Sequence, residues 1–294
     1  MTPKQIRSVL KVVEVGSVNR AAEVLHLAPS SISAQIRELS QELGVALFDQ
    51  VGRRIVLSRA GQGLLPDFKR FHALTQDIEQ QARSVSHEAV GELKLFAPSS
   101  MCIYRLPPLI EALQKTAPQL EVTLTHEPFD YQAALHNREI DAAILVSQYE
   151  DEQWENHPLM DESVIYVCHP DRHQNKKLSL EELQREPLIT TEPGCSYRVV
   201  AEGHFKTQGL TLKPRQSFSN VEVIRRCLLA NMGVALLPRC VVAEDLQRGD
   251  LVGQAVEGAP YGFRSMLVYP KGMKVLPKLG ALIECIYGDN KNIL

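Results

Sequence analysis

One short predicted helix carries polar residues whose types and spacing suit contacts with a nucleic acid. Its apolar side, at helical spacing, consists of Ile32, Ile36 and Leu39. Its polar outer side consists of Ser30, Ser31, Ser33 and Arg37. Hydroxyl and guanidinium groups donate hydrogen bonds to phosphate oxygens and base edges. The preceding helix carries the small residues Ala21 and Ala22, which allow close crossing, so the pair predicts a helix-turn-helix that enters a DNA major groove.

Thiols and imidazoles are the other groups that could do chemistry. The cysteines are Cys102, Cys168, Cys195, Cys227, Cys240 and Cys285. They form no CxxC pair, which predicts mostly buried thiols in a reducing cytoplasm. Cys195 stands at the start of a predicted helix near Arg198, where a thiol pKa can be lowered. The isolated His26, His126 and His169 lack metal-ligand spacing, so neither a metal nor another cofactor is predicted.

Enzyme signatures are missing from the sequence. It has no Gly-rich phosphate loop, no GxSxG elbow and no paired carboxylates in a recognisable frame, so we predict that the protein is not an enzyme.

Charge is divided unevenly along the 294 residues. Residues 1–60 hold eight Lys or Arg against five acidic residues, whereas the remainder holds 24 basic against 30 acidic residues. A basic head on an acidic body fits a DNA-binding module joined to a part with another role, although chance unevenness is an alternative explanation.

Neither a membrane span nor a secretion signal is predicted. The most apolar window, Cys227–Pro238, is about twelve residues long and contains Asn231, whereas a span needs about twenty. The N-terminus has no continuous apolar stretch between its charges. We therefore expect a cytoplasmic protein with no membrane partner.

The head is expected to be three helices and a hairpin. The first helix runs from about Pro3 to Val15, with Gly16 ending it and Ser17 capping the second helix. The third runs from about Pro29 to near Gly44. Apolar residues on both sides of a polar tip over residues 45–58 predict a β-hairpin wing. Its tip carries Arg53 and Arg54.

A long helix is predicted from about Gly61 to His87. Its apolar stripe, close to a heptad pattern, consists of Leu64, Phe68, Phe71, Ile78, Ala82 and Val85. We interpret it as a linker that pairs with a second copy; packing within its own domain is the alternative.

Beyond residue 90 short strands alternate with helices. The predicted strands are Leu93–Ala97, Leu120–Thr125, Ile140–Val146, Val164–Cys168, Leu188–Thr191, Val234–Pro238 and Arg264–Tyr269. The predicted helices lie near residues 106–116, 131–137, 196–207, 221–231 and 276–287. This alternation predicts parallel sheets covered by helices. The last strand and helix are expected to return to the first sheet, giving two lobes, two crossovers and a cleft between the lobes.

The chain resembles the LysR-type transcriptional regulators over nearly its whole length. The head motifs are GSVNRAAEVLHL (16–27), ISAQIREL (32–39), ELGVALF (42–48) and GRRIVLSRAG (52–61). The body motifs are LPPL (106–109), IDAAI (140–144), GVALLP (233–238) and VYPKG (268–272), in the family's order.

The resemblance implies an α + α/β architecture. It comprises an N-terminal winged helix-turn-helix (1–60), a long linker and dimerisation helix (61–90) and a two-lobed, periplasmic-binding-protein-like (type 2) effector domain (91–294). Lobe I would span about 91–163 and 266–294, and lobe II about 164–265. The implied partners are promoter DNA, a small-molecule effector, a homodimer or homotetramer, and RNA polymerase if the protein is an activator.

Site residues follow from this resemblance. DNA contacts are expected from Ser30, Ser31, Ser33, Arg37, Arg53 and Arg54. Ala28 and Ala34 depart from the family's common polar residues, which predicts greater reliance on DNA shape. The effector would lie between the lobes against Ser99, Ser100, Thr125, Ser147, Cys195, Ser196, Asn220 and Val221. Hydroxyls and helix N-termini suit an organic acid or an amino-acid-like anion, although N-capping explains each serine singly.

Two alternatives stay open. One branch of the family senses peroxide through a cysteine in the loop that contains Cys195; here that cysteine's place falls at Ser196, and Phe205 stands near its partner's place. A thiol sensor that uses Cys195 is therefore one alternative. A solute-binding protein without a DNA function is the other.

Overall fold

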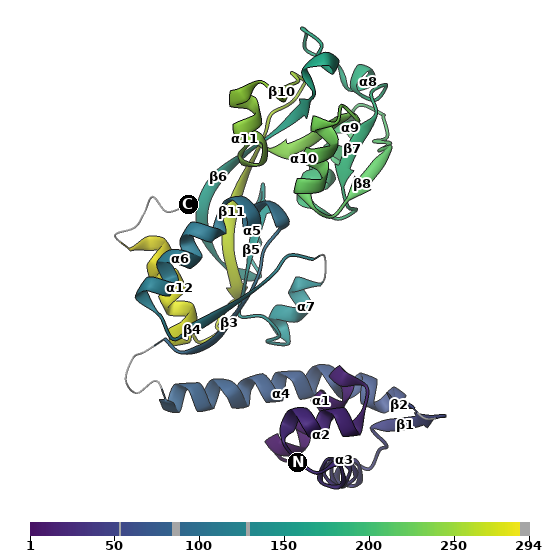
Figure 1. Ribbon diagram of the computed structural model, residues 1–294, viewed down its shortest axis with the longest axis vertical. Coiled ribbons are helices and arrows are strands. Elements are labelled where there is room, and N and C mark those ends of the chain that lie inside the picture. The colour runs from purple at the N-terminus through teal and green to yellow at the C-terminus, as the bar shows by residue number, and fades with distance from the viewer. Residues whose placement is uncertain (53, 84–88, 128–129, 289–294) are drawn as a thin grey trace. The chain divides into compact units, whose positions relative to one another are not determined.

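The computed structural model describes residues 1–52, 54–83, 89–127 and 130–288 (Figure 1). The chain divides into two compact units, residues 1–88 with 132–140 and residues 89–131 with 141–294. Across the described residues, no helix combines the length and apolar character that crossing a bilayer requires.

The first unit is built on three helices, a hairpin and a long fourth helix. Its elements are α1 (Pro3–Val15), α2 (Val18–Leu25), α3 (Pro29–Leu43), β1 (Phe48–Val51), β2 (Arg54–Leu57) and α4 (Arg59–Arg83), and it also holds residues 132–136 of α7 (Tyr131–His136). Gly16 ends α1 with φ 67°, and the Ser17 hydroxyl accepts the Arg20 N–H at 3.4 Å at the start of α2. Both predicted caps are confirmed.

The core of the first unit explains the helix-turn-helix geometry. Side chains from α1, α2, α3, α4 and the segment before β1 meet there: Ile6, Val9, Val12, Ala21, Ala22, Ile32, Ile36, Leu39, Leu47 and Phe68. Because Phe68 is 4% exposed, the first half of the α4 stripe packs on its own domain. Leu74 and Ile78, further along α4, are exposed. The alternative, packing within its own domain, therefore holds for Phe68, whereas pairing of the helix with a second copy stays a prediction.

The wing is shorter than expected. Strands β1 and β2 pair antiparallel from Phe48 opposite Leu57 to Val51 opposite Arg54. Residues 45–47 precede the hairpin, since Leu47 turns inward to the core and the Ser58 N–H donates to its carbonyl at 3.0 Å.

The second unit is one sheet with helices packed against it. Its strands are β3 (Gly91–Phe96), β4 (Leu120–Thr125), β5 (Ala142–Ser147), β6 (Trp154–Cys168), β7 (Leu188–Thr191), β8 (Gln216–Phe218), β9 (Val234–Pro238), β10 (Val252–Gly253) and β11 (Tyr261–Pro270). Its other elements are α5 (Ser99–Tyr104), α6 (Leu106–Thr116), the 3-10 turn η2 (Pro170–Arg172), α8 (Leu180–Leu183), α9 (Ser196–Thr207), α10 (Val221–Leu229), α11 (Arg239–Arg248) and α12 (Pro277–Tyr287).

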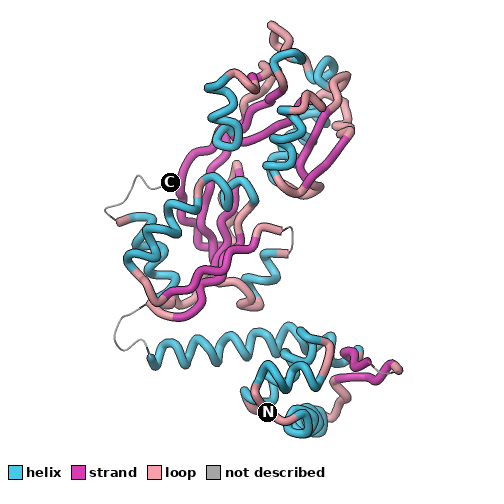
Figure 2. Tube along the Cα trace, in the orientation of Figure 1, coloured by secondary structure: helices cyan, strands magenta, loops and turns pink. Residues whose placement is uncertain are grey.

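Sheet topology gives two lobes that share two strands. The described strands order as β4-β3-β5-β11-β6-β9-β7-β8, with β10 on β6. Strands β6 and β11 run through both lobes, and Figure 2 shows them in magenta as the connection between the lobes. The two predicted crossovers and the return of the last strand are confirmed. The expectation of parallel sheets is confirmed within each lobe, where β3 pairs parallel with β4 and β5, and β7 pairs parallel with β8 and β9. It is wrong where the lobes join, because β11 pairs antiparallel with β5 and β6, and β9 pairs antiparallel with β6.

Helix α11 was not predicted from the sequence, and the reason is physical. Its inward positions are Val241, Val242 and Asp245, and Asp245 is fully buried. A carboxylate at a core position interrupts the apolar periodicity from which helices are predicted.

We predict that Gly61→Ala destabilises the first unit. A Cβ at Gly61 would lie 2.2 Å from the Leu47 carbonyl oxygen and 2.9 Å from Leu57 Cδ2, so α4 and the wing must separate. The expected loss is about 1–3 kcal/mol of unfolding free energy, the usual cost of overpacking. Urea unfolding, followed by circular dichroism, measures it.

Gly63→Ala is the matched control in the same helix. A Cβ there meets no atom within 4 Å, so this substitution is expected to be neutral or stabilising by up to about 1 kcal/mol. Equal effects of the two substitutions would contradict the close approach at Gly61.

Candidate functional site

The predicted recognition residues share an exposed face of α3. Ser30, Ser33 and Arg37 are exposed, while Ser31 is half-buried at the side of this face. The opposite side of the helix supplies the buried Ile32, Ile36 and Leu39. The helix is therefore anchored along one side and free to contact a ligand along the other.

The start of α3 and the wing complete this surface. Ala28 is the N-cap residue of α3, and its side chain makes no capping hydrogen bond in the described structure. The first turn begins at Pro29 and is held by main-chain hydrogen bonds to the Ala28 carbonyl. Arg54 is exposed on β2. Arg53, the other predicted wing cation, lies outside the described residues.

A cavity of about 450 Å³ lies between the two lobes of the second unit. Among the predicted effector residues it is lined by Ser99, Ser100, Ser147, Cys195, Ser196 and Val221. Thr125 and Asn220 are absent from the described lining. The Asn220 side chain accepts the Glu222 N–H at 2.8 Å as the N-cap of α10, and the Thr125 carbonyl accepts the Ala97 N–H at 3.0 Å.

Two predicted serines connect the lobes directly. Ser100 Oγ lies 3.1 Å from the Tyr197 hydroxyl of α9, and Ser99 Oγ accepts the Val221 N–H of α10 at 3.3 Å. The two serines of α5 therefore line the cavity and also form hydrogen bonds to lobe II.

Sequence reasoning missed much of the lining. The further residues include Phe96, Tyr131, Leu145, Tyr149, Asp151, Asn156, Thr191, Glu192, Ser219 and Met266. Most stand at strand ends or in loops, where no local periodicity marks them. The aromatic rings of Phe96 and Tyr131 stack with centroids 5.8 Å apart, giving the cavity an apolar side.

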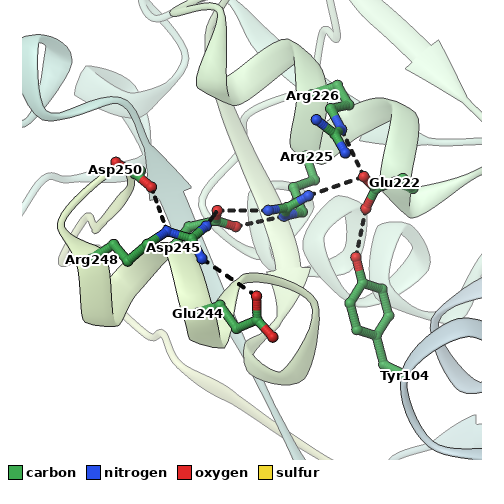
Figure 3. Close-up of polar contacts among 8 residues, drawn as sticks. All are labelled: Tyr104, Glu222, Arg225, Arg226, Glu244, Asp245, Arg248 and Asp250. Atoms are coloured by element: carbon green, nitrogen blue, oxygen red, sulfur yellow. Dashed lines mark hydrogen bonds and ion pairs between the residues drawn. The ribbon is translucent and has the colours of Figure 1, made fainter.

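A network of carboxylates and guanidinium groups ties α5 to α10 and α11 (Figure 3). We call it the arginine network; its members are Tyr104, Glu222, Arg225, Arg226, Glu244, Asp245, Arg248 and Asp250. The Arg225 guanidinium donates to both oxygens of Asp245, at 2.5 and 2.7 Å. The Tyr104 hydroxyl donates to Glu222 at 2.6 Å. This network fixes α10, whose first residue lines the cavity.

The environment of Cys195 opposes thiolate formation. Burial is the main cause that raises the pKa of the Cys195 thiol, although the Thr191 side chain and main-chain N–H groups at the start of α9 act in the other direction. Because the thiolate is the nucleophile, the structure disfavours the thiol-sensor alternative. Within the described part of the chain, no group of three or more His, Cys, Asp or Glu is arranged to hold a metal ion.

Two family models match different parts of the chain. A family model described as "Bacterial regulatory helix-turn-helix protein, lysR family" matches residues 3–62, and one described as "LysR substrate binding domain" matches residues 86–289. The HTH-type transcriptional regulator YwqM of Bacillus subtilis is 29% identical, covering 85% of this chain and 86% of that protein. The RuBisCO operon transcriptional regulator of Acidithiobacillus ferrooxidans is 27% identical, covering 97% and 93%.

Solved structures share the fold. A full-length OxyR variant from Pseudomonas aeruginosa superposes with a TM-score of 0.71 at 21% identity, covering 97% of this chain and 94% of that one. Full-length CbnR in complex with its target DNA superposes with a TM-score of 0.69 at 23% identity, covering 97% and 99%.

We predict that Asp245→Ala strongly destabilises lobe II. The substitution leaves the half-buried Arg225 guanidinium without its main partner, and breaking such a buried pair costs about 3–5 kcal/mol. The measurement is urea unfolding of the full chain. Asp250→Ala is the control, because its ion pair with Arg248 is exposed and such pairs contribute little. Equal destabilisation by both variants would contradict this role of Asp245.

Cys195 is expected to react slowly with iodoacetamide. Its raised pKa keeps the thiol protonated near pH 7.5, so alkylation in the folded protein should be markedly slower than in the urea-unfolded chain. Mass spectrometry of the Cys195 peptide measures both rates. A folded-state rate at least as fast as the unfolded-state rate would revive the thiol-sensor alternative.

Proposed function

The chain belongs to the LysR family of bacterial transcriptional regulators, and we propose that a small molecule in its interlobe cavity changes how it binds promoter DNA. In this proposal residues 1–60 bind DNA, residues 61–90 form the dimer and residues 91–294 bind the effector. The observation that carries the proposal is the presence, in one chain, of an exposed polar face on α3 and a polar cavity between two lobes.

DNA recognition would use α3 and the wing. Ser30, Ser33 and Arg37 face outward together, and Arg54 extends the cationic surface onto β2. Phosphate contacts would supply salt-dependent affinity, and base-edge contacts would supply sequence preference. With alanine at positions 28 and 34, this face has few long polar side chains, so DNA shape would contribute strongly to selectivity. The CbnR structure was solved with its target DNA, which supports the same use of the fold here.

Dimerisation would use the second half of α4. Leu74 is 47% exposed and Ile78 is 59% exposed, at a spacing of four residues on the helix. Burying both against a second copy would remove apolar surface from water. Such a homodimer, alone or paired into a homotetramer, would present two copies of α3 to a two-fold symmetric operator.

The effector would be a small organic acid or amino-acid-like anion. The cavity offers hydroxyls from Ser99, Ser100 and Ser196, together with the start of α9. The main-chain N–H groups at that helix start, which act on the Cys195 thiol, also favour a carboxylate. Regulation then requires that the effector bind one arrangement of the lobes more tightly than another.

The alternatives are less well supported. A solute-binding protein has no need of the helix-turn-helix that the first family model matches. Of the two relatives compared above, one is named for the RuBisCO operon and the name of the other gives no regulated system, so they do not by themselves select an effector.

We predict that Arg37→Ala weakens binding to the DNA just upstream of the gene. Loss of a direct contact from the recognition helix is expected to cost about 1–3 kcal/mol per protomer. Fluorescence anisotropy at several salt concentrations measures the affinity. A uniform loss with a shallower salt slope would identify a phosphate contact, whereas loss at one base position would identify a base contact.

Arg185→Ala is the control for this experiment. Arg185 is an exposed cation in the second unit, so its removal changes the net charge equally without touching α3. The proposal for Arg37 fails if the two variants bind the DNA equally well.

A further inference from the structure

The charged groups that line the cavity are acidic. They include the carboxylates of Asp151 and Glu192, and no Lys or Arg is among the described lining residues. The imidazole of His126 also lines the cavity. A ligand that is only an anion would therefore meet hydroxyls and main-chain N–H groups at one end and excess negative charge elsewhere.

The side-chain oxygen of Asn156 receives no hydrogen bond from the described residues. Its Nδ2 donates to the carbonyls of Asp151 and Trp154, both at 2.8 Å. Two carbonyl partners require the amide nitrogen on that side, so the orientation of the amide is determined. Its Oδ1 consequently points away from them and is buried, and no described protein group donates to it.

Glu192 presents a second such acceptor. Its Oε2 is buried and also receives no hydrogen bond from the described part of the protein. Asp151 differs, because its two oxygens accept the Gln153 N–H at 3.0 Å and the Trp154 indole N–H at 3.2 Å. Of the two carboxylates, Glu192 is thus the one with an unsatisfied oxygen.

Unpaired buried acceptors are costly, and native proteins rarely leave two of them, here on two residues that line one cavity, without a reason. An ammonium group offers three donors and a positive charge, and it makes stronger hydrogen bonds to a carboxylate than a neutral donor does. An ammonium within hydrogen-bond distance of both oxygens would satisfy them, and its charge would offset the acidic lining.

We propose that the effector carries a protonated amine that binds Glu192 and Asn156, so that it is an amino-acid-like zwitterion rather than a plain organic acid. The assignment rests on the proposed function of the cavity. The carboxylate of the ligand lies at the start of α9 with the serine hydroxyls, and its side chain packs toward Phe96, Tyr131 and Met266. A cavity of about 450 Å³ has room for a molecule of this size.

Thermal unfolding of the full chain with matched probes tests the class of ligand. The probes are the twenty proteinogenic L-amino acids, each compared with the carboxylic acid of the same skeleton that lacks the amine. A ligand of the folded state raises Tm. We expect at least one amino acid to raise Tm while its deaminated counterpart, at the same concentration, does not.

Glu192→Gln tests the residue. It keeps the size of the side chain and removes its charge, so calorimetric titration with the amino acid that raises Tm should show at least tenfold weaker binding. Glu181→Gln, an exposed carboxylate on α8 outside the cavity lining, is the control and should bind as the unmodified protein does. Glu192→Asp retains the charge and should bind more tightly than Glu192→Gln.

Three results would overturn the proposal: deaminated acids that raise Tm as much as the amino acids, unchanged affinity in Glu192→Gln, or no shift with any amino acid. Binding to the upstream DNA is measured on the same samples. Retained DNA binding with any of these results refutes the ligand class alone. Loss of sequence-specific DNA binding in the unmodified protein refutes the proposed function itself.

Discussion

The pairing of β6 with β11 is the constraint on which the second unit depends. These strands run antiparallel from Tyr261 opposite Val164 to Pro270 opposite Trp154, with a register shift between Ser265 and Met266. Strand β5 joins β11 in lobe I, and β9 joins β6 in lobe II. Each lobe is thus an extension of the same two-stranded ladder. Movement between the lobes has to bend or twist these two strands.

The cavity lies beside the two strands that such movement would bend or twist. Asn156 of β6 and Met266 of β11 line it, so a ligand there contacts the shared strands as well as both lobes. Helix α5 spans the same gap through Ser99, Ser100 and Tyr104. A ligand that changes these contacts changes the relative free energies of lobe arrangements, which is the physical requirement for a ligand-controlled switch.

Local sequence patterns predicted the elements better than the site. Gly16, Ser17 and Gly44 mark helix ends through backbone preferences that act within a few residues, and these boundaries are confirmed. Sheet direction depends on which distant strands pair, so the antiparallel return of β11 could not be read from alternation. The importance of Asn156 and Glu192 could not be predicted from the sequence. Whether a side-chain oxygen has a hydrogen-bond donor depends on all the groups that the fold brings around it. Asn220 shows the converse, since a residue suited to binding is already used as a helix cap.

The central claim is that occupancy of the cavity controls contacts with DNA. The most direct measurement is a DNase I footprint on the upstream DNA, made with the full chain with and without a saturating amount of an amino acid that raises its Tm. The account predicts that the boundaries of the protected region shift when the amino acid is added, because reciprocal coupling requires that a cavity ligand and DNA influence each other's binding. Identical footprints under both conditions, with the cavity demonstrably occupied, would contradict it.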